Sequence, residues 1–512
     1  MESVKLKDIY FGRADGLQES EEVNFENLFY KGNNKYSLLV ENKNKFIISG
    51  KKGTGKTILA KYFEKENERE RIPTKTLTKR EFVLRSLVEK GEFDLNNYDY
   101  GLFIEYVILI EMAKIILDNK KKLLRFKNFI KVYKIHKSLK YLDKIVIQRI
   151  SVENFTNKSY RTESGISTDN GYSVKVNKKP SSFEQKGNIT YNERKEIEYD
   201  KNPYYNILDN LKKNVVYILG LMPVNVIFDD LDEFDDKIDN NGQLIKFLIE
   251  FIESAYKLNI EFQKINKKNS RVILLIRSDI IKILNNYSTN LNKIVSDSEI
   301  RLNWIKKTQG TEMHPLLDMI CTKIMNSNKL LKNYTKEEII SQFFPVTING
   351  VPFLDHMLNS SFGRPRDIIN MLNIIKEEYP NAIKFSADYF KATQQEYSNK
   401  FIDELRNELS IHHDAKMVKE SFLILQYINK KTFWLSNVKD VLEKYSDEIS
   451  WFTSERQFLD FAYQYGMIGN TWKSKNENKY NFSWKYREDG HEKPDYEKRF
   501  YLHLALRKNI LD

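Results

Sequence analysis

Short apolar runs alternate with amphipathic stretches through the first 305 residues of the chain. The apolar runs have the length of buried strands and lie at 45–49, 224–228 and 271–276, and a further short strand is predicted at 299–304. Apolar residues at helical spacing lie beside them, at 58–63, 205–219 and 243–256. Strands that alternate with helices predict a parallel sheet covered by helices on both faces, which is a doubly wound α/β core.

The remaining residues have a different pattern. After Trp304 the spacing of apolar residues is almost entirely helical to about residue 410. Three further helical stretches then precede two alternating segments, 467–472 and 480–484, which predict a hairpin with a polar tip. We therefore expect three domains: an α/β core at 1–305, a helical lid at 306–412 and a winged-helix-like domain at 413–512.

A long helical segment is predicted inside the core, at 80–148, and its part at 120–137 is basic as well as amphipathic. One interpretation of the basic part is a nucleic-acid contact. The other, which we favour, is that its lysines face water while Phe126, Phe129 and Tyr133 face the core. Runs of charge are usually solvated faces of helices.

Composition bounds the class of protein. The chain has 512 residues, of which 41% are hydrophobic and 30% charged, as in a soluble protein of several domains. At 151–198 the composition shifts towards Asn, Ser, Thr, Gly and Lys, which predicts an insertion in the core. Partner contacts and a tolerated surface excursion are both open roles for it. The net charge of +12 suits a nucleic-acid partner, and it equally suits a lysine-rich composition.

Several classes of protein are excluded. The single cysteine, Cys321, excludes an intramolecular disulfide and a cysteine-based metal site. The N-terminus lacks the apolar core of a signal peptide. The longest apolar stretch, around Leu102–Leu117, is interrupted by Glu105, Glu111 and Lys114, so no membrane span is expected. These features together predict a cytoplasmic protein.

A glycine-rich turn follows the first strand directly. Residues 50–57 fit the phosphate-binding template G-x-x-x-x-G-K-[ST]. The glycines allow successive N–H groups to point at one centre, and the following helix adds its positive N-terminal end. Lys56 can reach the β- and γ-phosphates, and the Thr57 hydroxyl can bind Mg²⁺. The predicted nucleoside triphosphate site consists of Gly50, Lys51, Lys52, Gly53, Thr54, Gly55, Lys56, Thr57 and Ile58.

Acidic residues follow the second strand. Asp229 comes directly after it, which places this carboxylate at the sheet edge where the glycine-rich turn also lies. An acid there holds Mg²⁺, so we expect Asp229 and Thr57 to bind the metal. Asp230 is the first candidate for activating the attacking water, and Asp232 and Glu233 rank behind it. The alternative is that these acids cap the helix that follows.

Three arginines are candidates for contacts to the γ-phosphate. Arg277 ends the third strand at the same edge, although any strand end can carry a polar residue. Arg364 and Arg366 flank Pro365, which favours the first turn of a helix. Arginine is electrostatically unfavourable at a helix start unless an anion is near, so both arginines are candidates to reach a nucleotide from the lid. Ion pairs with nearby acids are the alternative.

These stretches, in this order, resemble the AAA+/STAND superclass of P-loop ATPases. Residues 50–57 match its Walker A motif, and 227–233 are similar to the Walker B segment of STAND and KAP-type ATPases. Residues 277–279 fall where sensor 1 does, and 363–369 are similar to the sensor 2 region of origin-recognition-like ATPases. The resemblance covers roughly residues 40–400 and implies an α/β P-loop NTPase core that binds ATP and Mg²⁺.

The resemblance also implies a function. Many relatives have glutamate where this chain has Asp230, so a slow, switch-like ATPase is expected. Bacterial ATPases of this build resemble components of anti-phage defence systems. We therefore expect the sensor or assembly subunit of such a system, acting with a separate effector protein and assembling as a homo-oligomer. A scaffold that binds the nucleotide without turning it over is a further hypothesis.

The alternative function is a DNA-binding ATPase for replication or transposition. Origin-recognition-like ATPases carry a winged helix behind their lid, and basic residues in a wing suit the phosphates of double-stranded DNA. The basic residues of this wing are Lys473, Lys475, Lys479, Lys485 and Arg487. The predicted helix at 455–466 is poorly charged for a major groove. We therefore expect either weak, sequence-indifferent DNA contact or use of this domain as a protein-interaction module.

Overall fold

The computed structural model describes residues 4–78, 97–123, 131–147, 205–231, 243–265, 270–305, 313–410, 413–473, 480–487 and 491–511. The chain divides into two compact units, and each is described by itself below. The larger unit comprises Met1–Glu81, Asn225–Asn259 and Arg271–Asp512, and the smaller comprises Phe82–Val224 and Ile260–Ser270.

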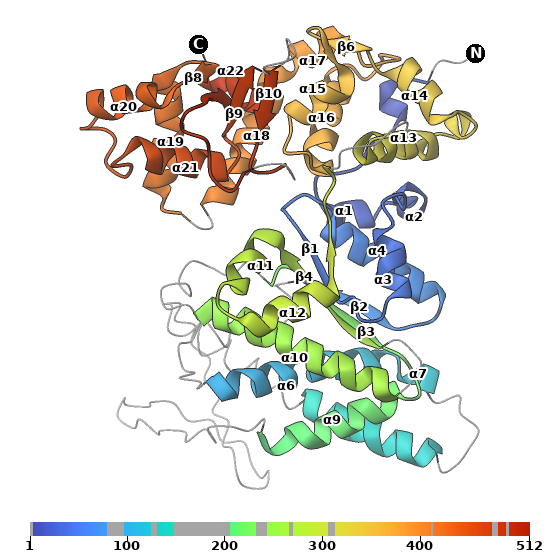
Figure 1. Cartoon of the computed structure of the whole chain (residues 1–512). Helices are drawn as coiled ribbons and strands as arrows, with labels where there is room; N and C mark the ends of the chain where they lie inside the picture. The colour runs from blue at the N-terminus through green and yellow to red at the C-terminus, as the bar shows by residue number, and fades with distance from the viewer. Residues whose placement is uncertain are drawn as a thin grey trace, which may run out of the picture. The chain divides into compact units, whose positions relative to one another are not determined.

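The larger unit contains a five-stranded parallel sheet (Figure 1), in the order β2-β3-β4-β1-β5. Its strands are β1 (Ile47–Gly50), β2 (Thr74–Leu77), β3 (Asn225–Phe228), β4 (Arg271–Arg277) and β5 (Glu299–Arg301). β4 lies between β1 and β3, and Gly50 is opposite Arg277. The predicted parallel sheet is confirmed, and because its strands all run the same way, their carboxyl ends share one edge.

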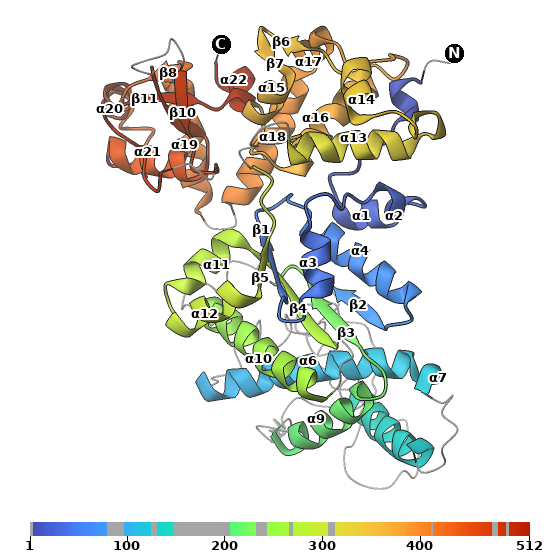
Figure 2. The same ribbon diagram turned by 45° about the vertical axis from the view of Figure 1, so that its right-hand side comes forward.

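Helices cover both faces of this sheet, as the apolar runs predicted. Figures 1 and 2 show α3 and α4 on one side and α10, α11 and α12 on the other. Ile48 and Ile273 pack with Phe63 on the first side, and Phe228 packs against Phe251 on the second. The helices of this core are α1 (Gly16–Ser20), α2 (Phe25–Leu28), α3 (Lys35–Glu41), α4 (Lys56–Arg69), α10 (Gln243–Ile265), α11 (Ser278–Asn285) and α12 (Thr289–Ser298).

The helical region predicted after the core is confirmed over the described residues 313–410, with one short antiparallel pair of strands inside it. Pro365 occupies the first turn of α16, as expected. The elements are α13 (Pro315–Ser327), α14 (Lys336–Phe343), β6 (Thr347–Ile348), β7 (Val351–Pro352), α15 (Phe353–Asn359), α16 (Pro365–Glu378), α17 (Ala387–Ala392) and α18 (Gln394–Leu409). Short 3-10 turns lie at Leu6–Asp8 and Lys329–Leu331.

Four helices, the last of them a short one, and a four-stranded antiparallel sheet form the described C-terminal part of the larger unit. The sheet has the order β10-β9-β11-β8, and the predicted hairpin is its β9–β10 pair. β8 and β11 were not predicted, because they are short and pair with residues far along the chain. The elements are α19 (Ala415–Ile428), β8 (Thr432–Phe433), α20 (Leu435–Lys444), α21 (Glu455–Gln464), β9 (Ile468–Lys473), β10 (Tyr480–Ser483), β11 (Arg499–Leu502) and α22 (Arg507–Ile510), with a 3-10 turn at Leu504–Leu506.

The described residues of the smaller unit are mostly helical. Its elements are α6 (Asn97–Asp118), α7 (Lys120–Leu123), a helix at 131–147, α9 (Tyr205–Leu219) and the last residues of α10. The Lys212 ammonium contacts the Glu105 and Glu261 carboxylates at 2.9 and 2.6 Å. No helix among the described residues is long and apolar enough to cross a membrane.

One expectation about this unit was wrong. Tyr133 does not face the core, since 65% of it is exposed on the helix at 131–147. The buried side of that helix is supplied by aliphatic residues such as Ile135 and Leu142, so the tyrosine ring is turned outward with the lysines. Phe126, Phe129 and the predicted insertion at 151–198 lie outside the described residues.

Candidate functional site

The glycine-rich loop, residues 50–57, connects the carboxyl end of β1 to the first residues of α4. Gly53 and Gly55 have φ angles of +81° and +92°, in the left-handed region that favours glycine. Gly50 is required for a different reason, because a Cβ there would lie 2.4 Å from the Thr54 hydroxyl. The glycines are therefore needed for the shape of the loop, whatever the loop binds.

Carbonyl oxygens of the loop accept hydrogen bonds from donors elsewhere in the chain. Arg364 donates to Lys52 O at 3.1 Å, and the Trp304 indole donates to Thr54 O at 2.9 Å. The backbone N–H of Arg366 donates to Gly53 O at 3.4 Å. Because the N–H and C=O of a trans peptide point in opposite directions, the bonds to Lys52 O and Thr54 O turn the N–H groups of Gly53 and Gly55 to the other side of the loop, where they can cradle an anion. The N–H of Thr54 instead donates to Lys51 O at 3.3 Å.

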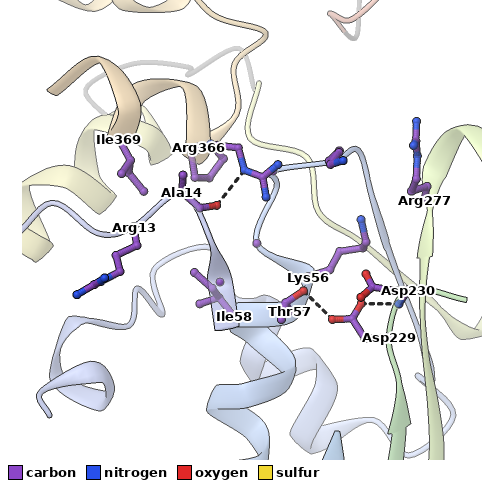
Figure 3. Close-up of a pocket in the computed structure, with 15 residues that line it drawn as sticks. Arg13, Ala14, Lys56, Thr57, Ile58, Asp229, Asp230, Arg277, Arg366 and Ile369 are labelled. Atoms are coloured by element: carbon purple, nitrogen blue, oxygen red, sulfur yellow. Dashed lines mark hydrogen bonds between the residues drawn. The ribbon is translucent and has the colours of Figure 1, made fainter. Parts of the chain in front are cut away.

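The predicted metal ligands lie together. The Thr57 hydroxyl donates a hydrogen bond to Asp229 Oδ2 at 2.7 Å, although the two residues are 172 positions apart in the chain. Asp229 is 2% exposed. The Lys56 ammonium donates to Gly50 O at 3.0 Å and lies close to Lys51 O at 3.5 Å, so it is folded back over the loop. Figure 3 shows these side chains converging from α4 and from the end of β3.

Asp230 adopts an unusual backbone conformation. Its φ angle is +58°, which is uncommon for residues other than glycine, and its N–H donates to Asp229 Oδ1 at 3.0 Å. Left-handed conformations of such residues cost about 1–3 kcal/mol and persist where surrounding contacts hold them. The strained backbone directs the Asp230 carboxylate to the same cavity as Thr57 and Asp229. Asp232 and Glu233, the other predicted acids, lie outside the described residues.

A cavity lies over the loop and brings most of the predicted residues together (Figure 3). The predicted residues that line it are Lys52, Gly53, Gly55, Lys56, Thr57, Ile58, Asp229, Asp230, Arg277 and Arg366. Four predicted residues do not line the cavity: Gly50, Lys51, Thr54 and Arg364. They form the base of the loop or its contacts to other elements.

The N-terminal segment forms a wall of this cavity that sequence reasoning missed. Arg13, Ala14 and Gly16 line it together with the loop. A Cβ on Gly16 would lie 3.0 Å from the Ile58 side chain, so only glycine allows this close approach without a shift. Asp15 caps α1 by accepting from two backbone N–H groups. In the sequence, the Asp15–Gly16 pair could have indicated the start of a helix. No neighbouring residue indicates that this helix packs beside the loop.

Arg364 lies in a buried ion cluster. It is 3% exposed, and its guanidinium contacts Asp367 at 3.0 Å and Glu408 at 3.1 Å as well as Lys52 O. Burial alone would lower the pKa of Arg364, but the two carboxylates raise it above its ordinary value. Arg364 therefore ties the start of α16 to the loop backbone.

Arg277 and Arg366 line the cavity in different ways. The Arg277 guanidinium contacts Asp279 at 2.6 Å and lies 3.7 Å from Glu408, and its side chain points away from Thr57 and Asp229 in Figure 3. Arg366 donates to the carbonyl oxygen of Ala14 at 2.9 Å and so touches both the N-terminal segment and the loop. Arg366 is thus the arginine of the helical region that meets the cavity.

Part of the helical region is similar to a known family of domains. Residues 314–406 match a family model described as a FunZ-associated C-terminal helical domain. The match runs from the first turn of α13 into α18, so it includes Arg364 and Arg366 but no strand of the parallel sheet. Among curated proteins, none matches the chain.

The residues around the loop fit a phosphate with its metal ion. A hydroxyl and a carboxylate 2.7 Å apart are a suitable pair of oxygen ligands for Mg²⁺, which otherwise keeps water and phosphate oxygens. Across the described residues, no group of three or more His, Cys, Asp and Glu side chains is arranged to hold a metal ion.

Lys51 belongs to the same cluster as Arg364. Burial lowers the pKa of its ammonium to about 8, while Glu408 acts in the opposite direction and Arg364 adds to the lowering. In the unfolded chain the pKa returns to its ordinary value near 10.5. Between these values the unfolded chain binds more protons, so this group makes the folded state more stable as the pH rises from about 8 towards 10.

Replacing Lys51 with methionine should therefore raise the melting temperature at pH 7, where the buried ammonium is charged. The gain should be about 2 °C for each kcal/mol recovered, and it should shrink as the pH rises through about 8. Differential scanning fluorimetry of both proteins between about pH 7 and pH 10 measures the difference. Lys75→Met, at an exposed position of β2, is the control. A gain that does not depend on pH would contradict the explanation.

Proposed function

We propose that the protein is an ATP-binding switch that hydrolyses ATP slowly with Mg²⁺. The observation that carries the proposal is the hydrogen bond of 2.7 Å between Thr57, at the start of α4, and Asp229, at the end of β3. A glycine-rich loop, a lysine and an oxygen pair at one sheet edge are the parts that bind a nucleoside triphosphate and its metal.

Each residue then has a role. Lys56 binds the β- and γ-phosphates, and the N–H groups of the loop bind the remaining phosphate oxygens. Thr57 and Asp229 hold Mg²⁺, which would neutralise phosphate charge when bound. Asp230 orients the attacking water and accepts its proton. Arg366 meets the phosphates from the helical region, and Arg277 takes part only after leaving Asp279.

The switch arises because two parts of the molecule contact one ligand. The loop belongs to the parallel-sheet core, whereas Arg366 belongs to α16, and a γ-phosphate is the group that both can bind. Hydrolysis removes that shared group, so the helical region is released. A ligand shifts such an equilibrium only by its difference in affinity for the two states, which the γ-phosphate supplies.

The wider proposal follows the resemblance to AAA+/STAND ATPases with a winged helix at the C-terminus. We place the protein as the sensor or assembly subunit of a bacterial defence system, acting with a separate effector chain and assembling with copies of itself on ATP. The match of residues 314–406 to the FunZ-associated helical domain supports a separate helical module that follows the parallel sheet in the chain. Arg366 belongs to this module.

The test is ATP binding, turnover and particle mass of the purified full chain. With Mg²⁺, ATP at about 100 times its dissociation constant should stabilise the protein by about 2.7 kcal/mol, and EDTA should remove most of this gain. Phosphate release measures turnover, and light scattering with and without ATP measures assembly. Thermal stability that does not respond to ATP would refute the proposal. If the protein binds ATP and changes mass but releases no phosphate, the hypothesis of a scaffold that binds the nucleotide without hydrolysing it would be supported instead.

A further inference from the structure

The outward side of the helix at 131–147 carries charge almost entirely of one sign. We call it the lysine face, and it consists of Lys131, Lys134, Lys137, Lys140 and Lys144, all exposed. Asp143 is the one acidic residue of the segment. This surface belongs to the smaller unit and takes no part in the cavity described above.

The opposite side of the same helix is fully used in packing. Ile135, Leu139, Leu142, Ile145 and Val146 are all buried. Helices that bind membranes insert their apolar side between the lipids. Since that side is occupied here, the lysine face offers a partner mainly charge and hydrogen bonds, together with the exposed ring of Tyr133 and the exposed side chain of Ile147 at the end of the helix.

This concentration of charge opposes the stability of the helix. Lysines at 131, 134, 137 and 140 stand three positions apart, and like charges at this spacing cost roughly 0.2–0.5 kcal/mol per pair. An external polyanion would remove the repulsion on the lysine face.

The lysine face is long enough to meet several phosphates of a nucleic acid. From Lys131 to Lys144 the helix rises about 20 Å, at 1.5 Å per residue. Duplex DNA carries a charge for about every 1.7 Å of its axis, so several phosphates lie within that length. Tyr133 and His136, both exposed between the lysines, add a ring that can stack on a base and a further hydrogen-bonding group.

We propose that the lysine face binds the sugar–phosphate backbone of nucleic acid without sequence preference. Half or more of protein–DNA hydrogen bonds go to phosphate and sugar, and lysine supplies them without reading bases. The proposal does not depend on ATP binding, because its residues are separate from the cavity.

The C-terminal hairpin is the competing site for nucleic acid. Its described basic residues are partly engaged within the protein: the Lys485 ammonium donates to Glu492 O at 3.0 Å, and Arg487 donates to Asn359 at 2.8 Å. Lys473 is exposed, whereas Lys475 and Lys479 lie outside the described residues. A variant of Lys473 therefore tests the hairpin separately.

The experiment measures binding of the full chain to a labelled duplex and a single strand of about 30 nucleotides by fluorescence anisotropy, across salt concentrations. Five phosphate contacts predict a salt slope of about 4.5, which is a loss of roughly 500-fold between about 50 and 200 mM salt. The triple variant Lys134→Glu, Lys137→Glu, Lys140→Glu should lower the slope by about 3 and weaken binding by more than about 20-fold.

The matched control carries the same change in net charge on the helical region: Lys329→Glu, Lys332→Glu and Lys384→Glu, all at exposed positions. It should bind nearly as the wild type does, and circular dichroism should show both triple variants folded. Equal loss in both variants, loss in Lys473→Glu instead, or no binding by the wild type would overturn the proposal. So would tighter binding to vesicles of anionic lipid than to either nucleic acid.

Discussion

Replacing Lys56 with alanine should weaken ATP binding by roughly 100- to 1000-fold. The Lys56 ammonium lies in the cavity and donates to Gly50 O at 3.0 Å, within reach of a phosphate held over the loop. Hydrogen bonds to charged groups contribute about 1.5–3 kcal/mol each, and two of them account for this loss at 1.4 kcal/mol per tenfold. Titration calorimetry with ATP and Mg²⁺ measures it directly.

A second lysine of the same helix provides the control for this experiment. Lys61 pairs with Glu64 at 3.0 Å and does not line the cavity, so Lys61→Ala should bind ATP as the wild type does. Tight binding retained by Lys56→Ala would refute the assignment of the site. Loss in both variants would indicate that α4 itself had been disturbed, which circular dichroism can detect.

Changing Asp230 to asparagine should lower ATP turnover by about 100- to 10,000-fold while leaving ATP binding close to that of the wild type. General-base catalysis contributes rate factors of this size, and asparagine keeps the shape of aspartate without its ability to take a proton. Phosphate release under single-turnover conditions measures the rate, and titration calorimetry measures the binding.

Asp229→Asn separates the metal site from the base. That variant keeps the shape of the side chain beside Thr57 but loses the negative charge of the carboxylate that would bind Mg²⁺. Its binding of ATP should therefore depend less on the metal. Full turnover in Asp230→Asn would exclude Asp230 as the base and direct attention to Asp232 or Glu233. Both of these remain candidates, since they follow in the same acidic stretch.

The arginines are the part of the site where the structure changes the expectation most. Arg364 and Arg277 share one carboxylate, that of Glu408, and each has a second acid beside it. Their charges are therefore balanced within the protein before any nucleotide binds. Arg366, in contact with Ala14 and Gly53, is the arginine of α16 that lines the cavity.

Local pattern was sufficient for much of the core. The apolar runs became β1, β3 and β4, and the helical spacing at 205–219 became α9 with the same limits. β2 was missed because Thr74–Leu77 is short and mostly polar, and it becomes a strand by pairing with β3. The predicted ends of helices were less accurate: α10 continues to Ile265, well beyond the predicted residue 256.

Residue type and spacing alone identified the loop, its lysine, its threonine and the acids after β3. These features are local, because a strand, a tight turn and a helix start are specified by neighbouring residues. Contacts between distant parts of the chain could not be read in this way. The approach of Gly16 to Ile58, the shared Glu408 and the outward position of Tyr133 depend on which surfaces pack together. Packing is set by the shapes of whole elements, which no single stretch of sequence contains.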